Sequence, residues 1–97
     1  MEKYYYVYIL ASKRNGTLYV GVTADIISRI DQHKNKIHAG FTAKYSVTRL
    51  VYYEEHETII EAIHREKLIK KWNRSWKISL IEQNNPNWDD LYHDLLT

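Results

Sequence analysis

The sequence predicts an α+β fold in which helices cover a small three-stranded antiparallel sheet. Two runs of β-forming residues, at 4–10 and 18–22, flank Asn15-Gly16, a dipeptide typical of tight hairpins. A third such run follows a segment with helical periodicity, and further helical segments come after it. The predicted order is therefore β-β-α-β-α-α-α, and the 97 residues fit one small domain spanning 1–97.

The hairpin presents hydroxyl groups on one face. A two-residue loop pairs Arg14 with Thr17 and fixes the register of the two strands. Tyr8 and Tyr19 then project from the same side of the sheet, and Gly21 leaves space on that side where a side chain would stand. The opposite face is predicted to be apolar and to consist of Val7, Ile9, Val20 and Val22.

The first helix is predicted over residues 25–37, where isoleucines recur at helical spacing. Thr23 or Asp25 can cap its first turn. On the helical wheel, Arg29 and His33 border the apolar stripe. An arginine at such a border can extend its charged end into solvent, or it can offer its planar guanidinium to a phosphate.

The remaining elements follow in order. Residues 38–46 are predicted as a loop and residues 47–55, rich in Val, Leu and Tyr, as the third strand. Thr58 and Glu61 match a capping box at the start of a second helix that ends near Trp72. A short helix is expected around 76–81, and a last one over 88–96, with Asn84-Asn85-Pro86 between them.

Glu66 is the most informative residue of the second helix. It lies about 20° from Ile59 on the wheel, inside the apolar stripe. A carboxylate on a core-facing arc is costly unless it is paired, protonated or bound to a cation. Two alternatives stay open at this point: a salt bridge to Arg29 or Lys70, or a metal ligand.

Composition excludes several classes of function. The chain has no cysteine, which excludes disulfides, thiolate zinc sites and cysteine nucleophiles. It has no run of about 18 apolar residues and no signal peptide, so we expect a cytoplasmic protein without membrane contact. Residues 1–81 hold all 14 Lys and Arg with a net charge of +6, whereas residues 82–97 carry −4. A basic body with an acidic tail points to a polyanionic partner.

These residues together resemble the GIY-YIG nuclease superfamily. Its two short motifs are matched by Tyr6-Val7-Tyr8 and Tyr19-Val20-Gly21, its helix-one arginine by Arg29, and its metal-binding glutamate by Glu66. The resemblance covers residues 4–77, which makes 78–97 a helical, acidic tail, and it is closest to small single-domain bacterial members of unassigned role. Tyr6 stands where the family name has Gly, and Val22 stands where repair-type relatives carry a lysine.

The resemblance implies a DNA endonuclease, as in repair or recombination, that uses one divalent cation, Mg²⁺ or Mn²⁺, held by Glu66. Tyr19 would deprotonate or orient the attacking water, Arg29 would stabilise the scissile phosphate, and Tyr8 would support water or phosphate. Since Val22 removes the usual lysine, His33 is a further candidate base or cationic neighbour. A protein partner or a homodimer would select the target.

A second reading is a nucleic-acid-binding module that has kept this fold and lost catalysis. In either reading, DNA phosphates would contact a basic cluster of Lys67, Lys70, Lys71, Arg74 and Lys77. In the binding module, Trp72 or Trp76 would stack on bases. A third reading is a protein-interaction domain that uses the tryptophan-containing acidic tail.

Overall fold

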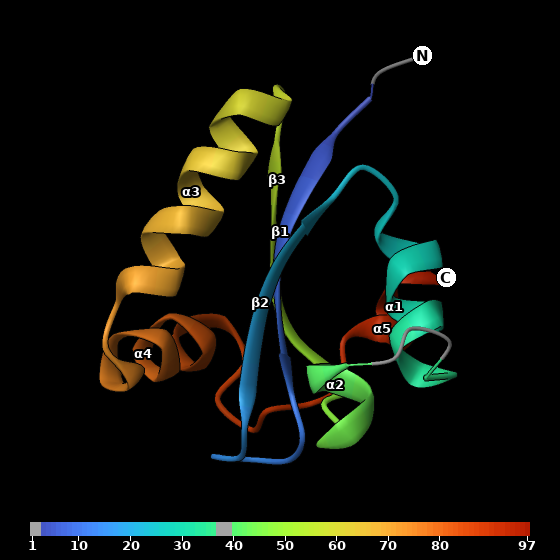
Figure 1. Ribbon diagram of the computed structural model, residues 1–97, viewed down its shortest axis with the longest axis vertical. Coiled ribbons are helices and arrows are strands. Elements are labelled where there is room, and N and C mark those ends of the chain that lie inside the picture. Colours follow the sequence, from blue (N-terminus) through green and yellow to red (C-terminus); the bar gives the residue numbers. More distant parts are fainter. Residues whose placement is uncertain (1–2, 37–39) are drawn as a thin grey trace.

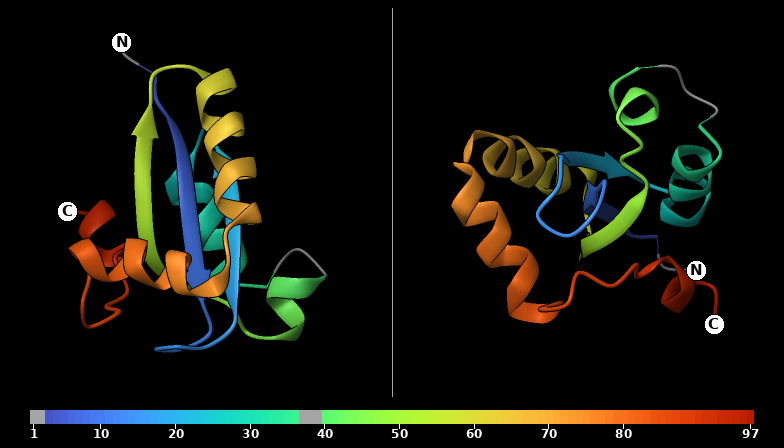
Figure 2. Two further views of the ribbon diagram at one scale, coloured as in Figure 1. Left: turned by 90° about the vertical axis from the view of Figure 1, so that its left-hand side faces the viewer. Right: turned by 90° about the horizontal axis from the view of Figure 1, so that it is seen from below.

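The computed structural model describes residues 3–36 and 40–97. Three antiparallel strands in the order β2-β1-β3 form a sheet with helices on both faces (Figures 1 and 2). The predicted α+β class and three-stranded antiparallel sheet are confirmed. The strands are β1 (Tyr5–Ala11), β2 (Leu18–Thr23) and β3 (Arg49–His56), and the helices are α1 (Ile26–Lys34), α2 (Phe41–Lys44), α3 (Ile59–Lys71), α4 (Arg74–Asn84) and α5 (Tyr92–Leu95). Within the described ranges, no helix combines the length and the apolar character needed to cross a bilayer.

The β1–β2 hairpin closes with a longer turn than expected. Gly16 N–H donates to the Lys13 carbonyl oxygen over 2.9 Å and Asn15 has a φ of 58°, so the Asn-Gly dipeptide occupies the last two positions of a four-residue turn. The strand register pairs Ala11 with Leu18. The predicted two-residue loop is therefore wrong, and each strand partner shifts by two residues. Because that shift is even, every side chain keeps its predicted face.

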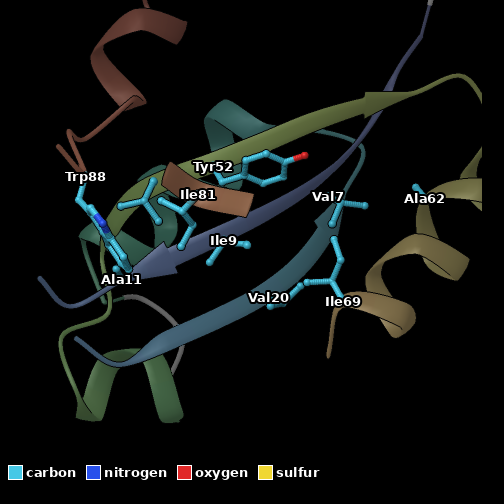
Figure 3. Close-up of a cluster of buried hydrophobic side chains, with 10 residues drawn as sticks. Val7, Ile9, Ala11, Val20, Tyr52, Ala62, Ile69, Ile81 and Trp88 are labelled. Atoms are coloured by element: carbon cyan, nitrogen blue, oxygen red, sulfur yellow. The ribbon is translucent and has the colours of Figure 1, made fainter. Parts of the chain in front are cut away.

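One face of the sheet packs against α3 and α4. Strand alternation places Val7, Ile9 and Val20 on this face, as predicted, and Val22 packs against them. Helices α3 and α4 contribute residues such as Ile69 to the same cluster (Figure 3). The remaining buried members of this cluster are Ala11, Val51, Tyr52, Ala62, Ile81 and Trp88.

The other face of β1 packs against α1 and the C-terminal segment. Its buried cluster consists of Tyr8, Leu10, Ile26, Ile30, Val47 and Leu50. Leu91, Tyr92 and Leu95 pack against this cluster from the C-terminal end of the chain. The sheet is thus covered on both faces, and the face of the hairpin that carries the hydroxyl groups of Tyr8 and Tyr19 lies against α1.

Helix α1 starts as predicted and ends before the predicted boundary. The Asp25 carboxylate accepts a hydrogen bond from Ser28 N–H over 3.2 Å, so Asp25 is the N-cap. The helix ends at Lys34, and the predicted end at Ile37 lies outside the described residues. The predicted loop at 38–46 is wrong in part, because residues 41–44 form the short helix α2. A single turn is too short to show helical periodicity in the sequence.

The C-terminal helices differ in length from the prediction. Thr58 caps α3 by accepting from Glu61 N–H, as expected, and Trp72 ends the helix. Helix α4 starts after its own cap, Asn73, and so extends beyond the predicted 76–81 in both directions. By contrast, only residues 92–95 of the predicted helix at 88–96 are helical.

Residues 85–91 lie along the outer edge of β3 instead of forming a helix. Leu91 N–H donates to the Leu50 carbonyl oxygen over 2.7 Å, and Leu50 N–H donates to the Asp90 carboxylate over 3.2 Å. The Asn85 side-chain amide donates to the Val51 carbonyl oxygen over 3.0 Å. These bonds satisfy backbone groups that an edge strand would otherwise leave open.

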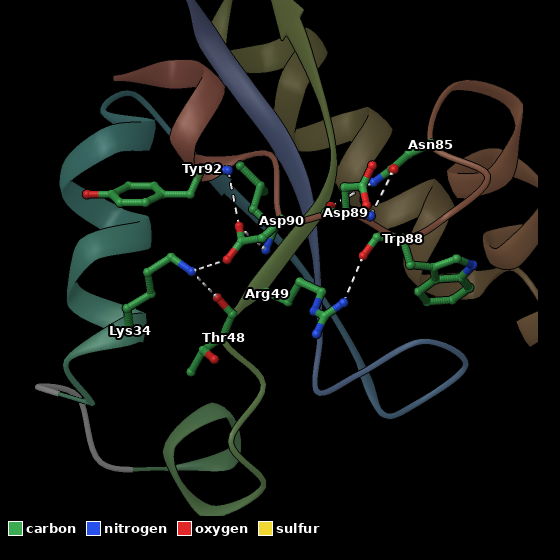
Figure 4. Close-up of polar contacts among 9 residues, drawn as sticks. Lys34, Thr48, Arg49, Asn85, Trp88, Asp89, Asp90 and Tyr92 are labelled. Carbon is green, nitrogen blue, oxygen red and sulfur yellow. Dashed lines mark hydrogen bonds and ion pairs between the residues drawn. The ribbon is translucent and has the colours of Figure 1, made fainter. Parts of the chain in front are cut away.

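The same segment connects the sheet to α1. Asp90 forms an ion pair with Lys34, whose ammonium also donates to the Thr48 carbonyl oxygen, and Arg49 donates to the Trp88 carbonyl oxygen over 3.1 Å (Figure 4). Trp88 is fully buried, with its indole N–H on the Glu82 carboxylate at 2.8 Å. Residues 78–97 therefore contribute to the core, and Trp88 is not exposed for a partner as the interaction-domain reading required.

Candidate active site

Tyr8, Tyr19 and His33 form a compact cluster between the sheet and α1. The Tyr8 hydroxyl lies 3.1 Å from His33 Nε2. The ring of Tyr19 lies 6.3 Å from that of Tyr8 and 5.5 Å from that of His33, measured between centroids. The predicted common face of the two tyrosines is thus found in the structure, and the hydroxyl face of the hairpin meets the predicted histidine of helix α1.

Gly21 makes room for this arrangement. It pairs with Tyr8 across the β1–β2 ladder. A Cβ atom at Gly21 would lie 2.4 Å from the Tyr8 hydroxyl oxygen and 2.4 Å from Cζ, closer than nonbonded atoms approach. The Tyr8 ring therefore occupies the space that the missing side chain leaves, as the sequence pattern indicated.

Thr42, which the sequence did not single out, completes the cluster. His33 Nδ1 lies 3.1 Å from the Thr42 hydroxyl oxygen, so both ring nitrogens of His33 have hydrogen-bond partners. His33 is 6% exposed and Thr42 is 8% exposed. The partner on Nδ1 of a histidine fixes the ring orientation and the tautomer. Thr42 reaches this position because α2 packs against α1, a tertiary contact with no signal in the local sequence.

Tyr8 stays protonated at neutral pH. Burial raises the pKa of its hydroxyl well above the ordinary tyrosine value, and the neighbouring Tyr19 raises it further. Arg29 lowers the pKa of Tyr8 and Glu66 raises it, but neither outweighs burial. A hydroxyl that keeps its proton serves as a hydrogen-bond donor and not as a base.

Arg29 and Glu66 approach the cluster from helices on opposite faces of the sheet. Arg29 is exposed on α1, one turn before His33. Glu66 lies on α3, and its side chain is 13% exposed. Both charges act on the Tyr8 hydroxyl, as their opposite effects on its pKa show. One cation and one carboxylate thus flank the tyrosines, while Arg29 stays open to solvent.

The partner of Glu66 is Lys70, one of the two cations that the sequence offered. Lys70 Nζ lies 3.2 Å from Glu66 Oε2 in an i,i+4 pair, and the Lys70 side chain is 50% exposed. No cluster of three or more His, Cys, Asp or Glu side chains that could hold a metal occurs in residues 3–36 and 40–97. A single carboxylate still fits Mg²⁺, which keeps several waters and binds through one or two carboxylates plus substrate phosphates.

The predicted basic cluster has fewer open cations than its sequence suggests. Four of its members are exposed, namely Lys67, Lys70, Lys71 and Arg74, and the fifth, Lys77, is half-buried. Besides the pairing of Lys70, Arg74 donates to two carbonyl oxygens of the β1–β2 turn at 2.7 and 2.6 Å. Lys77 donates to the Lys70 carbonyl oxygen over 3.4 Å. Lys67 and Lys71 are therefore the members best placed to meet an external phosphate.

The tryptophans at the α3–α4 junction line a shallow groove. Trp72 and Trp76 pack edge to face with centroids 6.0 Å apart, and Trp76 is 57% exposed. The groove has a volume of about 230 Å³ and is completed by Ser79, Leu80 and Gln83. It lies on α4 and the end of α3, away from the cluster around His33.

A second polar network, also missed by sequence reasoning, joins α3 to β3. Glu54 accepts hydrogen bonds from Tyr52 and Arg65 and lies 2.6 Å from His56 Nε2. Burial alone would raise the pKa of Glu54, but these three partners lower it below its ordinary value. Arg65 also lies over the ring of Trp72 at 5.2 Å. With its carboxylate satisfied on all sides, this network holds α3 on the sheet.

Comparison with known proteins agrees with the resemblance. The GIY-YIG catalytic domain model matches residues 4–79. A UPF0213 protein of Staphylococcus saprophyticus is 40% identical over 83 residues, which is 86% of this chain and 99% of that protein. A UPF0213 protein of Staphylococcus aureus is 35% identical over 79 residues, or 81% of this chain and 95% of that protein.

A solved structure supports the same fold. The solution NMR structure of a UPF0213 protein from Bacillus halodurans superposes with a TM-score of 0.56 and 29% identity, covering 90% of this chain and 92% of that one. The matched region includes both strands of the hairpin and the helices that carry Arg29 and Glu66. The chain therefore belongs to the GIY-YIG family, a family associated with nucleases.

Proposed function

We propose that this protein is a metal-dependent DNA endonuclease that hydrolyses phosphodiester bonds in the cytoplasm. The observation that carries the proposal is the Tyr8–Tyr19–His33 cluster, with Arg29 one turn before His33 on α1 and Glu66 on α3. A phosphodiester hydrolase needs a group that orients or deprotonates water, a cation at the scissile phosphate and a ligand for a metal. This set of side chains supplies all three.

The two tyrosines take different roles. Tyr8 is buried and protonated, so it donates a hydrogen bond to hold water or phosphate. Tyr19 is only half-buried beside it and orients the attacking water; as the Tyr19 oxygen takes the proton of that water, the Tyr19 hydroxyl gives its own proton to bulk solvent. His33 lies between the rings and Thr42, where it fixes the positions of both phenols and supplies a second site for that proton.

Glu66 is the proposed ligand of one Mg²⁺ or Mn²⁺, together with water and the substrate phosphate. Such an ion, when bound, supplies Lewis acidity and neutralises the charge that develops on the phosphate. Arg29, exposed at the rim, holds the scissile phosphate with its planar guanidinium. Lys70 pairs with Glu66 without metal and becomes free to contact a neighbouring phosphate once the carboxylate binds a cation.

DNA is the proposed substrate, with Lys67 and Lys71 as backbone contacts beside the site. The described domain is small, which supports a protein partner or a second copy for target selection. A catalytically inactive binding module is the alternative, because Val22 stands where repair-type members of the family have a lysine.

Nicking of supercoiled plasmid separates these two functions. The wild-type protein should nick DNA with Mg²⁺ or Mn²⁺ and lose that activity with chelator, and Glu66→Gln should bind DNA without nicking it. A matched control is Glu61→Gln, which changes an exposed carboxylate on the same helix. DNA binding without any nicking by the wild-type protein would favour the inactive module, and nicking by Glu66→Gln at the wild-type rate would refute the assignment of Glu66.

A further inference from the structure

The short helix α2 presents two opposite surfaces beside the candidate active site. Thr42 points inward and contacts His33. Phe41 and Tyr45 are 47% and 48% exposed, and their rings pack on each other with centroids 4.9 Å apart. The core does not use this aromatic pair, although large exposed rings are uncommon without a function. Its position is fixed by the same helix that orients His33.

The chain segment that carries this pair has no acidic residue. Residues 32–53 contain no Asp or Glu, but they contain Lys34, Lys36, Lys44 and Arg49. Lys34 and Arg49 are used in contacts with the C-terminal segment. Lys44 is exposed with its ammonium 5.4 Å from the centroid of the Tyr45 ring, and Lys36 is exposed and contacts the Ser46 hydroxyl.

We propose that Phe41 and Tyr45 form a stacking platform for an unpaired nucleotide of the DNA strand that is cut, with Lys44 holding its phosphate. This inference rests on the proposed function and narrows it to substrates with a single-stranded or displaced nucleotide next to the cleavage point. The two rings are tilted by 51° to each other and offer exposed aromatic faces on which a base can stack. Exposed lysines next to aromatic rings are the pattern by which proteins bind single strands without reading sequence.

The positive charge of the surrounding segment favours a nucleic acid as the ligand of the platform. An apolar pair alone could equally bind a protein, but a surrounding segment that has lysines and no acids favours a polyanion. A paired base is inaccessible to these rings because it is stacked inside the duplex. The platform therefore favours DNA with an unpaired end, flap or gap over continuous duplex.

Fluorescence anisotropy with a labelled single-stranded oligonucleotide and the duplex of the same sequence tests the proposal. Replacement of both rings, Phe41→Leu with Tyr45→Leu, should weaken single-strand binding about 10-fold or more and leave duplex binding nearly unchanged. Tyr45→Phe keeps the ring and should retain wild-type affinity. Tyr45→Phe is thus the matched control, whereas Trp76→Leu removes an exposed ring in the α3–α4 groove and tests that rival stacking site. Thermal melts check that the variants fold, which their half-exposed positions favour.

The outcomes separate this proposal from the proposed function. Loss of the single-strand preference in the double variant, with plasmid nicking by the wild-type protein, supports both. Equal weakening of single-strand and duplex binding, or no weakening, overturns the platform and leaves the nuclease proposal to the nicking assay. If the double variant loses single-strand affinity as expected but the wild-type protein never nicks DNA, the result supports the platform on a binding module. Greater weakening by Trp76→Leu than by the double variant would move base stacking to the α4 groove and overturn the platform.

Discussion

Replacing Glu66 with Gln should separate catalysis from stability. Among the described residues, Glu66 forms its ion pair with Lys70, whose side chain is half-exposed and keeps its hydration when the partner loses its charge. An i,i+4 ion pair with one such half-exposed partner contributes about 0.3–0.5 kcal/mol to the free energy of unfolding. For a domain of this size that corresponds to a change in melting temperature of about 3 °C or less. Phosphodiester cleavage, by contrast, should disappear because the only carboxylate of the proposed site is lost.

Two measurements on the same preparations test this expectation. Thermal unfolding in chelator gives the stability of wild type, Glu66→Gln and Lys70→Gln, and plasmid nicking with Mg²⁺ gives the activity. Lys70→Gln removes the same ion pair but keeps the carboxylate, so it should melt like Glu66→Gln and still nick DNA. If Glu66 belonged to a buried salt bridge, its replacement would instead leave the partner charge buried and unpaired, and the free energy of unfolding would fall by about 3–5 kcal/mol. A fall of more than about 10 °C in the melting temperature of Glu66→Gln would therefore identify Glu66 as part of a buried salt bridge and not as a metal ligand.

Three further predictions concern the support of the site. Thr42→Val should remove the hydrogen bond between Thr42 and His33 Nδ1, cost about 1–2 kcal/mol in urea unfolding and change the tautomer seen in imidazole NMR spectra; unchanged spectra would contradict the role of Thr42. Gly21→Ala should displace the Tyr8 hydroxyl, and the overpacking should lower the free energy of unfolding by about 1–3 kcal/mol and the melting temperature by several degrees. A Gly21→Ala variant as stable as the wild-type protein would show that Tyr8 moves freely. Asp90→Asn should destabilise the protein at neutral pH but not near pH 2. Burial alone would raise the folded pKa of Asp90, but Lys34 and backbone N–H groups outweigh burial and lower it, so the stabilisation by Asp90 is present above the unfolded value of about 4 and is lost as pH falls through the folded pKa. A stability difference that persists at pH 2 would contradict this linkage.

The fold was predictable where local patterns coincide with tertiary structure. The alternation of Val7, Ile9 and Val20 with Tyr8 and Tyr19 along the strands assigns both faces of the hairpin. The assignment survives the change in register because the strands shift by two residues, an even number. The turn itself was not predictable, because an Asn-Gly dipeptide fits either the centre of a two-residue loop or the end of a four-residue turn. Only the pairing of the whole strands decides between them.

The candidate site was predictable for residues on regular elements and unpredictable for contacts between elements. Helical wheels placed His33 at the border of the apolar stripe of its helix and Glu66 inside the stripe of the next helix. The contact of His33 with Thr42 depends on how α2 packs, which no period in the sequence encodes. Likewise, sequence counts every lysine and arginine equally, whereas the structure uses Arg74 within the fold and leaves Lys44 exposed beside an aromatic pair.

Cleavage of a short labelled DNA in water enriched in oxygen-18 shows whether Glu66 and the tyrosine cluster direct water to a phosphodiester. Mass spectrometry of the products reads both the cut and the source of the new oxygen. We expect Mg²⁺- or Mn²⁺-dependent products in which the new phosphate terminus carries the heavy isotope, and no products from Glu66→Gln purified in parallel. Intact DNA with the wild-type protein, products without the isotope, or equal cleavage by Glu66→Gln would contradict this expectation.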